Sequence, residues 1–248
     1  MMNSTQKAAA FKALHVKGTP LVLHNIWDAG SARAVADAGA KAIATGSWAV
    51  AAAQGFADGE ALPMAASLRV ASEVAGAVDV PVSVDFEGGY ALTPTDVAVN
   101  AVLLREAGAI GMNFEDRIVA GKGLHALEDQ AARIAAIRAA VGPAFFINAR
   151  TDVFFCGDTA PTAELMARAV ARAIAYGEAG ADGIFVPGLT DVGQIAQFCA
   201  AQDLPVNVMR MADDPSIATL AQAGVARISH GPAPYLAMMK ALGAAAAV

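Results

Sequence analysis

Three carboxylates stand at the ends of two neighbouring hydrophobic runs, in a chain where only 16% of the residues are charged. Asp85 and Glu87 end the run PVSVDFEGGY, and Glu115 ends the run AIGMNFED. Acids placed where buried strands emerge are costly to desolvate unless a partner uses their charge. A hard divalent cation takes oxygen ligands from one or two carboxylates and keeps several waters. We therefore expect Asp85, Glu87 and Glu115 to form a Mg²⁺ site, which Mn²⁺ could also occupy.

The spacing of these acids supports a shared site. On a strand, Asp85 and Glu87 would point to the same face because they are two positions apart. Like charges within a few ångströms of each other would raise one another's pKa in the absence of a cation. The alternative is a salt-bridge cluster around Arg150, which ends the run AFFINARTD, together with Arg117. One arginine cannot balance this many acids, which favours the metal.

The composition excludes several classes of function. The chain has 248 residues, of which 56% are hydrophobic, a net charge of −6 and a pI of about 5.1. Because it has no basic run, we expect neither nucleic-acid binding nor binding to an anionic membrane. The amino terminus lacks the continuous apolar stretch of a signal peptide, and no apolar stretch is long enough to span a membrane. Cys156 and Cys199 form no CxxC motif, which suits a cytoplasmic protein without disulfides.

Short apolar runs rich in β-branched residues alternate with longer helical patterns, and the alternation repeats eight times. The runs are almost wholly apolar, as expected for parallel strands covered on both faces. Several helical patterns end in Ala-Gly-Ala, where glycine would cap the helix before the next strand begins. The expected strands are 21–25, 41–46, 80–86, 109–114, 144–149, 182–187, 204–209 and 225–229. The expected helices lie near 30–38, 63–77, 94–107, 127–140, 161–179, 191–200, 214–223 and 233–246.

Eight βα units in about 250 residues predict a single α/β domain over residues 1–248, a (β/α)8 TIM barrel. A doubly wound open sheet is the structural alternative, but the segment HNIWDAGSA after the first strand lacks its glycine-rich nucleotide loop. In a barrel the active site lies at the carboxyl ends of the strands. Polar or turn residues follow these ends at Asn25, Trp27, Asp28, Gly46, Ser47, Asp85, Glu87, Glu115, Asp116, Arg150, Asp152, Pro187, Gly188, Asn207, Arg210, Ser229 and His230.

The ordered motifs LVLHNIWDAGSARAVADAGAKAIATGS, VDFEGGY, NFED, INARTD and RISHGP resemble those of the isocitrate lyase and phosphoenolpyruvate mutase superfamily, over essentially the whole chain. The likeness is to its short branch, similar to carboxyphosphonoenolpyruvate phosphonomutase. It implies that Asp85 lies closest to Mg²⁺, with Glu87 and Glu115 completing the shell largely through water. The resemblance also implies a homo-oligomer, a dimer or tetramer, in which the last helix is often exchanged between subunits.

The same resemblance assigns roles around a small anionic 2-oxo-acid substrate. Trp27, Gly46 and Ser47 look like the pocket for its 2-oxo-carboxylate. Asp58, in the segment GFADGE, matches an acid near the reacting bond. Arg150 matches the arginine that meets the enolate or leaving-group oxyanion, and its planar fork suits that task better than a lysine would.

Other residues keep two interpretations. His230 is a candidate catalytic residue because a histidine at a strand end can titrate near neutrality, and a plain hydrogen-bonding role is the alternative. Asn207 is expected to line the pocket floor. Lys122 and His125 could supply a proton, or could be solvated residues of a lid. Trp48 is expected to serve packing.

The predicted lid, DRIVAGKGLHALED, departs from both well-defined branches of the superfamily. It lacks the K-[KR]-C-G-H gate of the isocitrate and methylisocitrate lyases. Pro187 and Gly188 stand where the phosphonate-cleaving members have a histidine. The resemblance therefore supports formation of an enolate more strongly than any particular leaving group.

Three hypotheses follow. The first is a Mg²⁺-dependent lyase that cleaves a C–C bond of a small 2-oxo or 2-hydroxy acid, as in oxaloacetate decarboxylation or a retro-aldol reaction. The second keeps the site but cleaves a C–P bond, as a phosphonopyruvate hydrolase or phosphoenolpyruvate mutase. The third is a catalytically weak relative that binds 2-oxo acids. A Schiff-base aldolase is disfavoured because Lys41 begins its strand, and no lysine follows a strand end.

Overall fold

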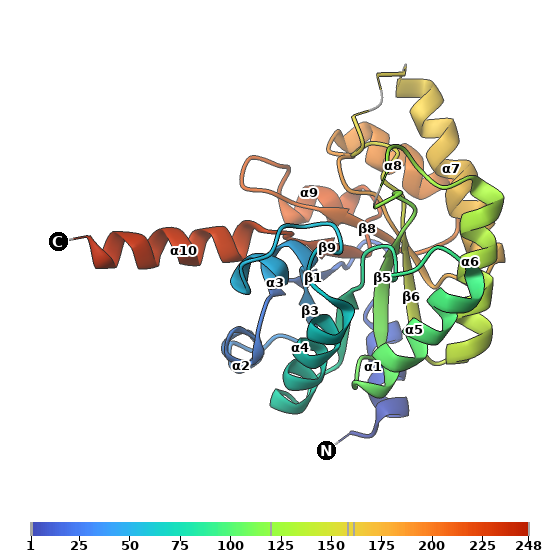
Figure 1. Cartoon of the computed structure of the whole chain (residues 1–248). Coiled ribbons are helices and arrows are strands. Elements are labelled where there is room, and N and C mark those ends of the chain that lie inside the picture. The colour runs from blue at the N-terminus through green and yellow to red at the C-terminus, as the bar shows by residue number, and fades with distance from the viewer. Residues whose placement is uncertain (1, 120, 158, 161, 248) are drawn as a thin grey trace.

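The strands form one parallel sheet that curves into a nearly closed barrel, as the alternating sequence pattern predicts (Figure 1). A computed structural model describes residues 2–119, 121–157, 159–160 and 162–247. The first predicted strand is divided at His24 into β1 and β2, which lie at the two ends of the strand order. The strands are β1 (Leu21–Leu23), β2 (Asn25–Ile26), β3 (Ile43–Thr45), β4 (Val82–Asp85), β5 (Gly111–Glu115), β6 (Phe146–Arg150), β7 (Gly183–Phe185), β8 (Val206–Met209) and β9 (Arg227–Ser229).

Each of the eight predicted helices is present, and they surround the barrel or follow its last strand (Figure 1). Two more occur: α1, within the helical pattern of the amino terminus, and α3, directly after β3, which the sequence analysis did not predict. The helices are α1 (Ser4–Ala13), α2 (Ala29–Asp37), α3 (Ser47–Ala53), α4 (Met64–Ala77), α5 (Pro94–Glu106), α6 (Leu127–Val141), α7 (Thr162–Glu178), α8 (Val192–Ala201), α9 (Ile217–Gln222) and α10 (Ala233–Ala246).

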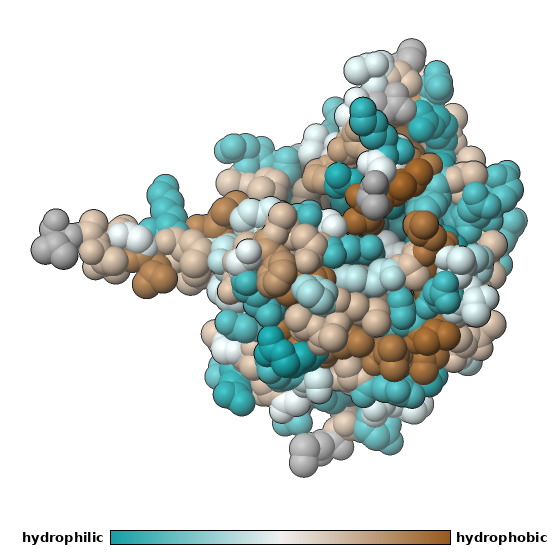
Figure 2. All heavy atoms as spheres, viewed as in Figure 1, coloured by the Kyte–Doolittle hydropathy of each residue, from teal (hydrophilic) through white to brown (hydrophobic). Residues whose placement is uncertain are grey.

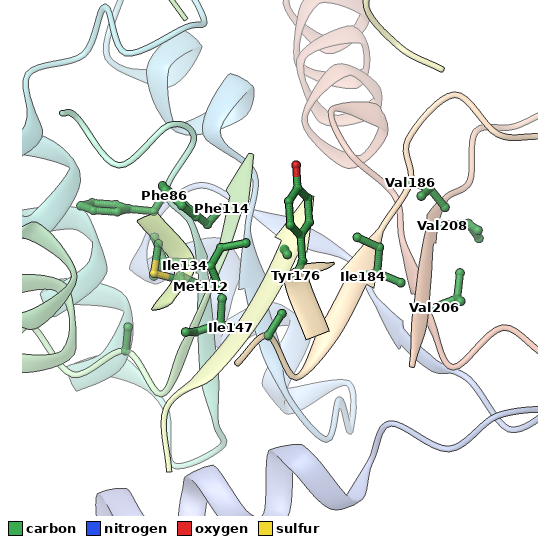
Figure 3. Packing of buried hydrophobic residues seen from close by; sticks show 14 of the residues in the cluster. Phe86, Met112, Phe114, Ile134, Ile147, Tyr176, Ile184, Val186, Val206 and Val208 are labelled. Carbon is green, nitrogen blue, oxygen red and sulfur yellow. The ribbon is translucent and has the colours of Figure 1, made fainter. Parts of the chain in front are cut away.

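Strand β5 shows why the runs look uniformly apolar although they carry the site. All five of its residues are buried. Met112 and Phe114 belong to the hydrophobic core between the strands and the helices, together with Ile134 of α6 (Figure 3). Because side chains alternate along a strand, Asn113 and Glu115 point to the other face, the barrel interior.

The strand register brings polar residues of the interior to the same height. Asp85 pairs with Asn113 across β4 and β5, and Asn113 pairs with Asn148 across β5 and β6. Two residues further along β5 and β6, Glu115 lies beside Arg150. The register therefore places the predicted acids and the predicted arginine at one rim of the barrel.

Helix α1 closes the opposite end of the barrel. Phe11 is fully buried and meets Phe146 edge-to-face at 5.2 Å, while the His15 ring stacks on Phe146 at 4.2 Å. The His15 Nδ1 lies 2.8 Å from the Phe11 carbonyl oxygen. Burial lowers the pKa of His15 to about 3, and the charge of Arg227 is the second cause. This histidine is therefore a neutral packing residue of the barrel floor.

Helix α10 projects from the barrel, and none of its residues is buried (Figure 1). Its exposed side chains include Leu236, Met238, Met239 and Leu242. Figure 2 shows hydrophobic residues along the projecting helix. Among the described residues, no helix combines the length and apolarity needed to cross a bilayer.

Because the buried His15 is neutral, we expect the stability of the folded protein to fall in acid, and we expect His15→Phe to reduce this loss. Its pKa in the folded state lies below the unfolded value of 6.5, so the unfolded state binds the proton more tightly. Stability is therefore lost as the pH falls from 6.5 toward 3. We expect wild type to lose roughly 1.6 kcal/mol more than His15→Phe between pH 6.5 and pH 5, measured by urea denaturation. Equal losses in the two proteins would show that His15 does not couple folding to pH.

Candidate active site

A cavity of about 390 Å³ opens at the carboxyl ends of the strands. Its lining combines polar residues from β2 to β6 with mainly apolar residues from β7 to the start of α10. The lining residues are Asn25, Gly46, Ser47, Trp48, Asp58, Asp85, Asn113, Arg150, Phe155, Phe185, Pro187, Met209, Met211, Ser229, Gly231 and Pro232. Gly46, Ser47, Asp58, Asp85 and Arg150, all predicted as site residues, thus face one cavity.

Asp85 is held at the last position of β4 by neighbouring strand ends. Its Oδ2 accepts from the backbone N–H of Ser47 at 3.1 Å and from the Ser47 hydroxyl at 2.8 Å. Its own N–H donates to the hydroxyl of Thr45 at 2.9 Å. Because Ser47 begins α3, the carboxylate meets the positive end of that helix. Helix α3, absent from the prediction, therefore has the local task of orienting Asp85.

Asn113 lies beside Asp85, and two donors deeper in the barrel fix the orientation of its side-chain amide. Its Oδ1 accepts from Asn148 Nδ2 at 2.9 Å and from Arg227 Nη2 at 3.2 Å. With the carbonyl oxygen engaged by these two donors, the amide Nδ2 faces Asp85 Oδ1 at 3.4 Å. An amide nitrogen has two N–H donors, so one remains for a ligand in the cavity.

Arg227 is fully buried inside the barrel, below the acids. Its Nε and Nη1 find no hydrogen-bond partner among the described protein atoms. Burial lowers the pKa of Arg227 to about 10, and the charge of Asp85 opposes that change. The guanidinium thus adds positive charge beneath the cavity without lining it.

Glu87 lies on a turn and not on a strand. β4 ends at Asp85, and Glu87 has a φ of +50°, so the strand alternation used to align the two acids does not apply. That argument was wrong because the strand ends at Asp85, one residue before its expected end, and the chain has turned by the time it reaches Glu87. Glu87 Oε2 accepts instead from the N–H of Glu60 at 2.7 Å, and Glu60 Oε1 accepts from the N–H of Tyr90 at 2.8 Å.

These two turns hold all the non-glycine residues with positive φ in the described parts of the chain: Glu60, Glu87 and Tyr90. Such conformations persist only where the surroundings enforce them, and they cluster at functional sites. Arg133 from α6 provides further support, because its Nη2 donates to the carbonyl oxygens of Gly88 at 2.6 Å and Ala91 at 2.9 Å. The crossed contacts between the 58–60 and 86–90 segments hold the acidic rim in place.

The predicted rise in pKa occurs for Glu87 and Glu115. Burial, then the charge of Asp85, raises the pKa of Glu87 to about 8. Burial also raises the pKa of Glu115 to about 8, although the charge of Arg150 opposes it. Each of these side chains is only 5% exposed. Desolvation is therefore a larger cause than the like-charge repulsion that the sequence argument used.

Arg150 ends β6 and is oriented by two carboxylates. Its Nε and Nη2 donate to Asp152 Oδ1 and Oδ2 at 2.6 and 2.9 Å, and its Nη1 lies 3.0 Å from Glu115 Oε2. A guanidinium has five N–H donors, so three face these acids and two remain for the cavity. The salt-bridge alternative considered for the acids is thus realised for Glu115 but not for Asp85 or Glu87.

Asp116, although it follows Glu115 directly, belongs to a separate network behind the site. It is fully buried and accepts from the Tyr176 hydroxyl at 2.8 Å, Arg172 Nη1 at 3.0 Å and the N–H of Asp152 at 3.0 Å. Tyr176 points from α7 toward this end of the barrel (Figure 3). Asp116 thus supports the Asp152 turn and, through it, Arg150.

Asp58 faces the cavity from the segment between α3 and α4. Burial, then the charge of Asp85, raises the pKa of Asp58, while the charges of Arg150 and Arg117 oppose the change. The segment predicted as the lid packs on the turn that contains Glu87. Val119 of this segment lies so close to Gly88 that a Cβ atom at Gly88 would be 2.9 Å from the Val119 side chain. Lys122 and His125 of this segment do not line the cavity.

The side chains of three predicted site residues do not line the cavity. Trp27 packs edge-to-face on Tyr235 at 5.0 Å and does not line the cavity. Asn207 is fully buried and bonds Ser229, so it lies one layer below the lining. The His230 ring stacks on His24 at 4.5 Å and approaches the Leu23 carbonyl oxygen at 3.1 Å, which turns it away from the cavity. Only the backbone N–H of His230 contributes there, by holding Asn25 Oδ1 at 2.9 Å.

The donor set suits a cation that keeps much of its water. Among the described residues, no group of three or more His, Cys, Asp or Glu side chains is close enough to hold an ion directly. Asp85 faces the cavity, whereas Glu87 and Glu115 lie behind it with partners of their own. One direct carboxylate ligand with further acids at water distance is the mode that Mg²⁺ favours.

The lining also contains residues that the sequence analysis did not assign to the substrate. Asn25 was expected only as one of the residues at the strand ends, Asn113 was treated as part of an apolar run, and Trp48 was assigned to packing. The inward position of Asn113 could have been found by counting two residues back from Glu115. Phe155, Met209 and Met211 gave no such signal.

Comparison with known proteins identifies the family of the chain. Residues 11–248 match the sequence profile of the family described as phosphoenolpyruvate phosphomutase. A crystal structure from Burkholderia cenocepacia J2315, described as a candidate phosphonomutase, superposes with a TM-score of 0.94 at 52% identity over 98% of both chains. An uncharacterized Mycobacterium tuberculosis protein, MT2054, is 36% identical over 96% of this chain and 87% of its own.

Another relative has an assigned activity. The oxaloacetate decarboxylase of Pseudomonas entomophila is 28% identical over 94% of this chain and 81% of its own. The family match covers nearly the whole chain, and the motifs that suggested it lie at the carboxyl ends of the barrel strands. The chain is an enzyme of the phosphoenolpyruvate phosphomutase family, within the isocitrate lyase and phosphoenolpyruvate mutase superfamily of lyases and mutases.

Proposed function

We propose that this enzyme is a Mg²⁺-dependent lyase that cleaves a C–C bond of a small 2-oxo or 2-hydroxy acid and leaves a pyruvate-type enolate. The observation that carries the proposal is the convergence of Asp85, Arg150 and Asp58 on one cavity. An oxaloacetate decarboxylase among the relatives supports the same class of reaction. The reaction requires stabilisation of the negative charge that develops on the former carbonyl oxygen.

Residues of the chain would bind and orient the substrate. The Asn113 amide, which has one N–H free, suits a carboxylate or carbonyl oxygen near Asp85. The two free N–H groups of Arg150 suit the enolate or leaving-group oxygen, because their direction is already fixed by Asp152 and Glu115. Such preorganised donors lower the barrier because they do not have to reorient during the reaction.

Asp58 is the group best placed to move a proton. It lines the cavity, and its carboxyl makes no ion pair among those found in the described structure. Its pKa is raised, chiefly by burial, which moves a carboxyl group toward the range useful for general acid–base work. We propose that Asp58 accepts the proton of a substrate hydroxyl, or returns a proton to the product.

Asp85 would hold Mg²⁺ with Glu87 and Glu115 behind it, since this donor set fits a hydrated hard cation. When bound, Mg²⁺ would supply positive charge beside the 2-oxo-carboxylate. The ion would also offset the excess of acid at the rim, where Arg150 alone pairs with both Glu115 and Asp152.

A C–P bond enzyme is the second candidate. The similar Burkholderia cenocepacia structure described as a candidate phosphonomutase favours it. Release of phosphate or rearrangement from phosphonopyruvate, against release of CO₂ or an aldehyde from 2-oxo acids, distinguishes the two functions. The buried Pro187, two residues after β7, offers no charge or hydrogen-bond donor for a phosphoryl group, which favours the C–C reaction.

We further propose that the enzyme is a homo-oligomer, a dimer or tetramer, in which α10 contacts a second copy. Helix α10 leaves the barrel with four large apolar side chains exposed. A helix with no buried residue has little reason to be stable alone, because helices gain most of their stability from packing. Exchange of this helix between subunits would cover those side chains.

Asp85→Ala should abolish Mg²⁺-dependent binding of oxalate or pyruvate, because it removes the one predicted metal ligand that faces the cavity. Isothermal titration calorimetry with Mg²⁺ or EDTA measures this loss. Asp79→Ala, at an exposed position away from the site, should bind as wild type does. Undiminished Mg²⁺-dependent binding by Asp85→Ala would refute the metal assignment.

Arg150→Lys should lower kcat by roughly 100-fold, because lysine cannot grip Asp152 with two donors and still present two more to the cavity. Pyruvate release can be followed with a coupled lactate dehydrogenase assay. The matched control is Arg138→Lys, because Arg138 also pairs with a carboxylate, Asp182, but outside the site. That control should affect stability and leave kcat unchanged. A near-normal kcat for Arg150→Lys would remove Arg150 from the mechanism.

The double variant Met239→Glu and Leu242→Glu should lower the molar mass measured by light scattering, since it places charge on the exposed face of α10. Leu92→Glu, at a position 70% exposed on another surface, should keep the mass of wild type. A monomeric wild type, or a double variant that keeps the oligomer, would contradict the proposed role of α10.

A further inference from the structure

The cavity is divided into two unlike halves. The strand ends from β2 to β6, the start of α3 and the segment before α4 contribute Asn25, Ser47, Asp58, Asp85, Asn113 and Arg150, all polar or charged. The other half is built mostly from β7, β8 and the segment after β9. Its apolar lining side chains are Trp48, Phe155, Phe185, Pro187, Met209, Met211 and Pro232.

The charges of the lining argue against a second anionic group on the substrate. Arg150 is the only cation among the described residues that line the cavity, and it already pairs with Glu115 and Asp152. Arg210 lies between the lining residues Met209 and Met211 but does not line the cavity itself, and its Nε donates to the Pro215 carbonyl oxygen at 2.8 Å. Arg117 acts on Asp58 from an exposed position outside the lining. A second carboxylate or a phosphonate placed in the apolar half would thus be desolvated without a partner, which is costly.

The size of the cavity points the same way. Its volume of about 390 Å³ equals the share of roughly a dozen water molecules at about 30 Å³ each. A pyruvate-sized head bound by Asn113 and Arg150 fills only part of that space. The Phe155 and Phe185 rings lie 5.5 and 5.7 Å from the Arg150 guanidinium carbon, so the apolar half begins directly beside the polar one.

We infer that the substrate is a monoanionic 2-oxo acid with an apolar substituent, alkyl or aryl, on the carbon that leaves. The inference rests on the proposed C–C lyase function and deepens it. The fitting reaction is the retro-aldol cleavage of a 4-hydroxy-2-oxo acid. Asp58 takes the proton of the C4 hydroxyl, the C3–C4 bond breaks, and its electrons form the enolate of pyruvate. The apolar aldehyde leaves, and protonation at C3 completes pyruvate, so no oxidant or second substrate is needed.

Binding of unreactive 2-oxo acids tests the substrate class without requiring turnover. We expect affinity, measured by calorimetry with Mg²⁺, to rise by about fourfold for each methylene from pyruvate to 2-oxohexanoate. Phenylpyruvate should bind more tightly than 2-oxoglutarate. In the pyruvate-release assay, 4-hydroxy-2-oxo acids with propyl or phenyl substituents should have at least a tenfold higher kcat/KM than 4-hydroxy-2-oxoglutarate.

Two variants locate the effect. Met209→Lys places a cation in the apolar half and should reverse the preference in favour of 2-oxoglutarate, whereas Met209→Leu should keep the apolar preference. Leu92→Lys, outside the cavity, serves as the matched surface control. A reversed preference in Leu92→Lys, or none in Met209→Lys, would contradict the assignment of this wall.

The outcomes separate this inference from the proposed function. Tighter binding or faster cleavage of dicarboxylates or phosphonopyruvate overturns the inference, even if the enzyme remains a lyase. Failure of pyruvate and oxalate to bind with Mg²⁺ overturns the proposed function itself. Tight binding of apolar 2-oxo acids without cleavage of any 4-hydroxy acid supports the apolar half and rejects the retro-aldol step.

Discussion

Burial of carboxylates at one rim of the barrel is the constraint on which the rest of the site depends. Glu87, Glu115, Asp116 and Asp152 are each at most 5% exposed, and Asp85 stands in front of them. Burying such charges is tolerable only when each finds hydrogen bonds or a counter-charge. Asp116 obtains both from Arg172 and Tyr176, and Asp152 obtains them from Arg150. Glu87 has a backbone N–H, and Asp85 has the Ser47 donors. The arrangement leaves the carboxyl groups of Asp85 and Asp58 facing the cavity, which supports the proposed binding of a cation there.

The supporting structure serves that rim. The turn with Glu87 is braced by Glu60 and by Arg133, and Asn113 is fixed by Asn148 and the buried Arg227. These contacts come from α6, β5, β6 and β9 and from two loops, so the site depends on the closure of the barrel. The opposite half of the rim is apolar and carries no comparable network among the lining residues that the structure describes. One half therefore suits the chemistry of the 2-oxo acid, and the other half suits selection of its substituent.

The fold was largely predictable from the sequence because parallel strands covered on both faces leave a simple apolar signal. All eight strand regions and the helices between them occur as expected, with the first strand divided at His24. Helix α3 was missed because its alanine-rich residues run on from the β3 pattern without a capping side chain; Gly46 makes no side-chain cap.

The sequence predicted which residues lie at the strand ends. It did not predict which of their side chains face the cavity. Asp85, Ser47 and Arg150 follow strands directly, and they line the cavity. Trp27 and His230 also follow strands, but their rings turn to Tyr235 and His24. Such choices depend on neighbours distant in the sequence, so local spacing cannot reveal them. The brace between Glu60 and Glu87 is of the same kind, because it joins two loops 27 positions apart.

The most direct test of the central claim is anomalous diffraction from crystals grown with Mn²⁺ in place of Mg²⁺ and soaked with oxalate, which resembles the enolate of pyruvate. We expect one anomalous peak beside the Asp85 carboxylate, with water between the ion and Glu87 or Glu115, and oxalate in contact with the ion. Oxalate bound without a peak at Asp85, or a peak only elsewhere in the molecule, would contradict the account.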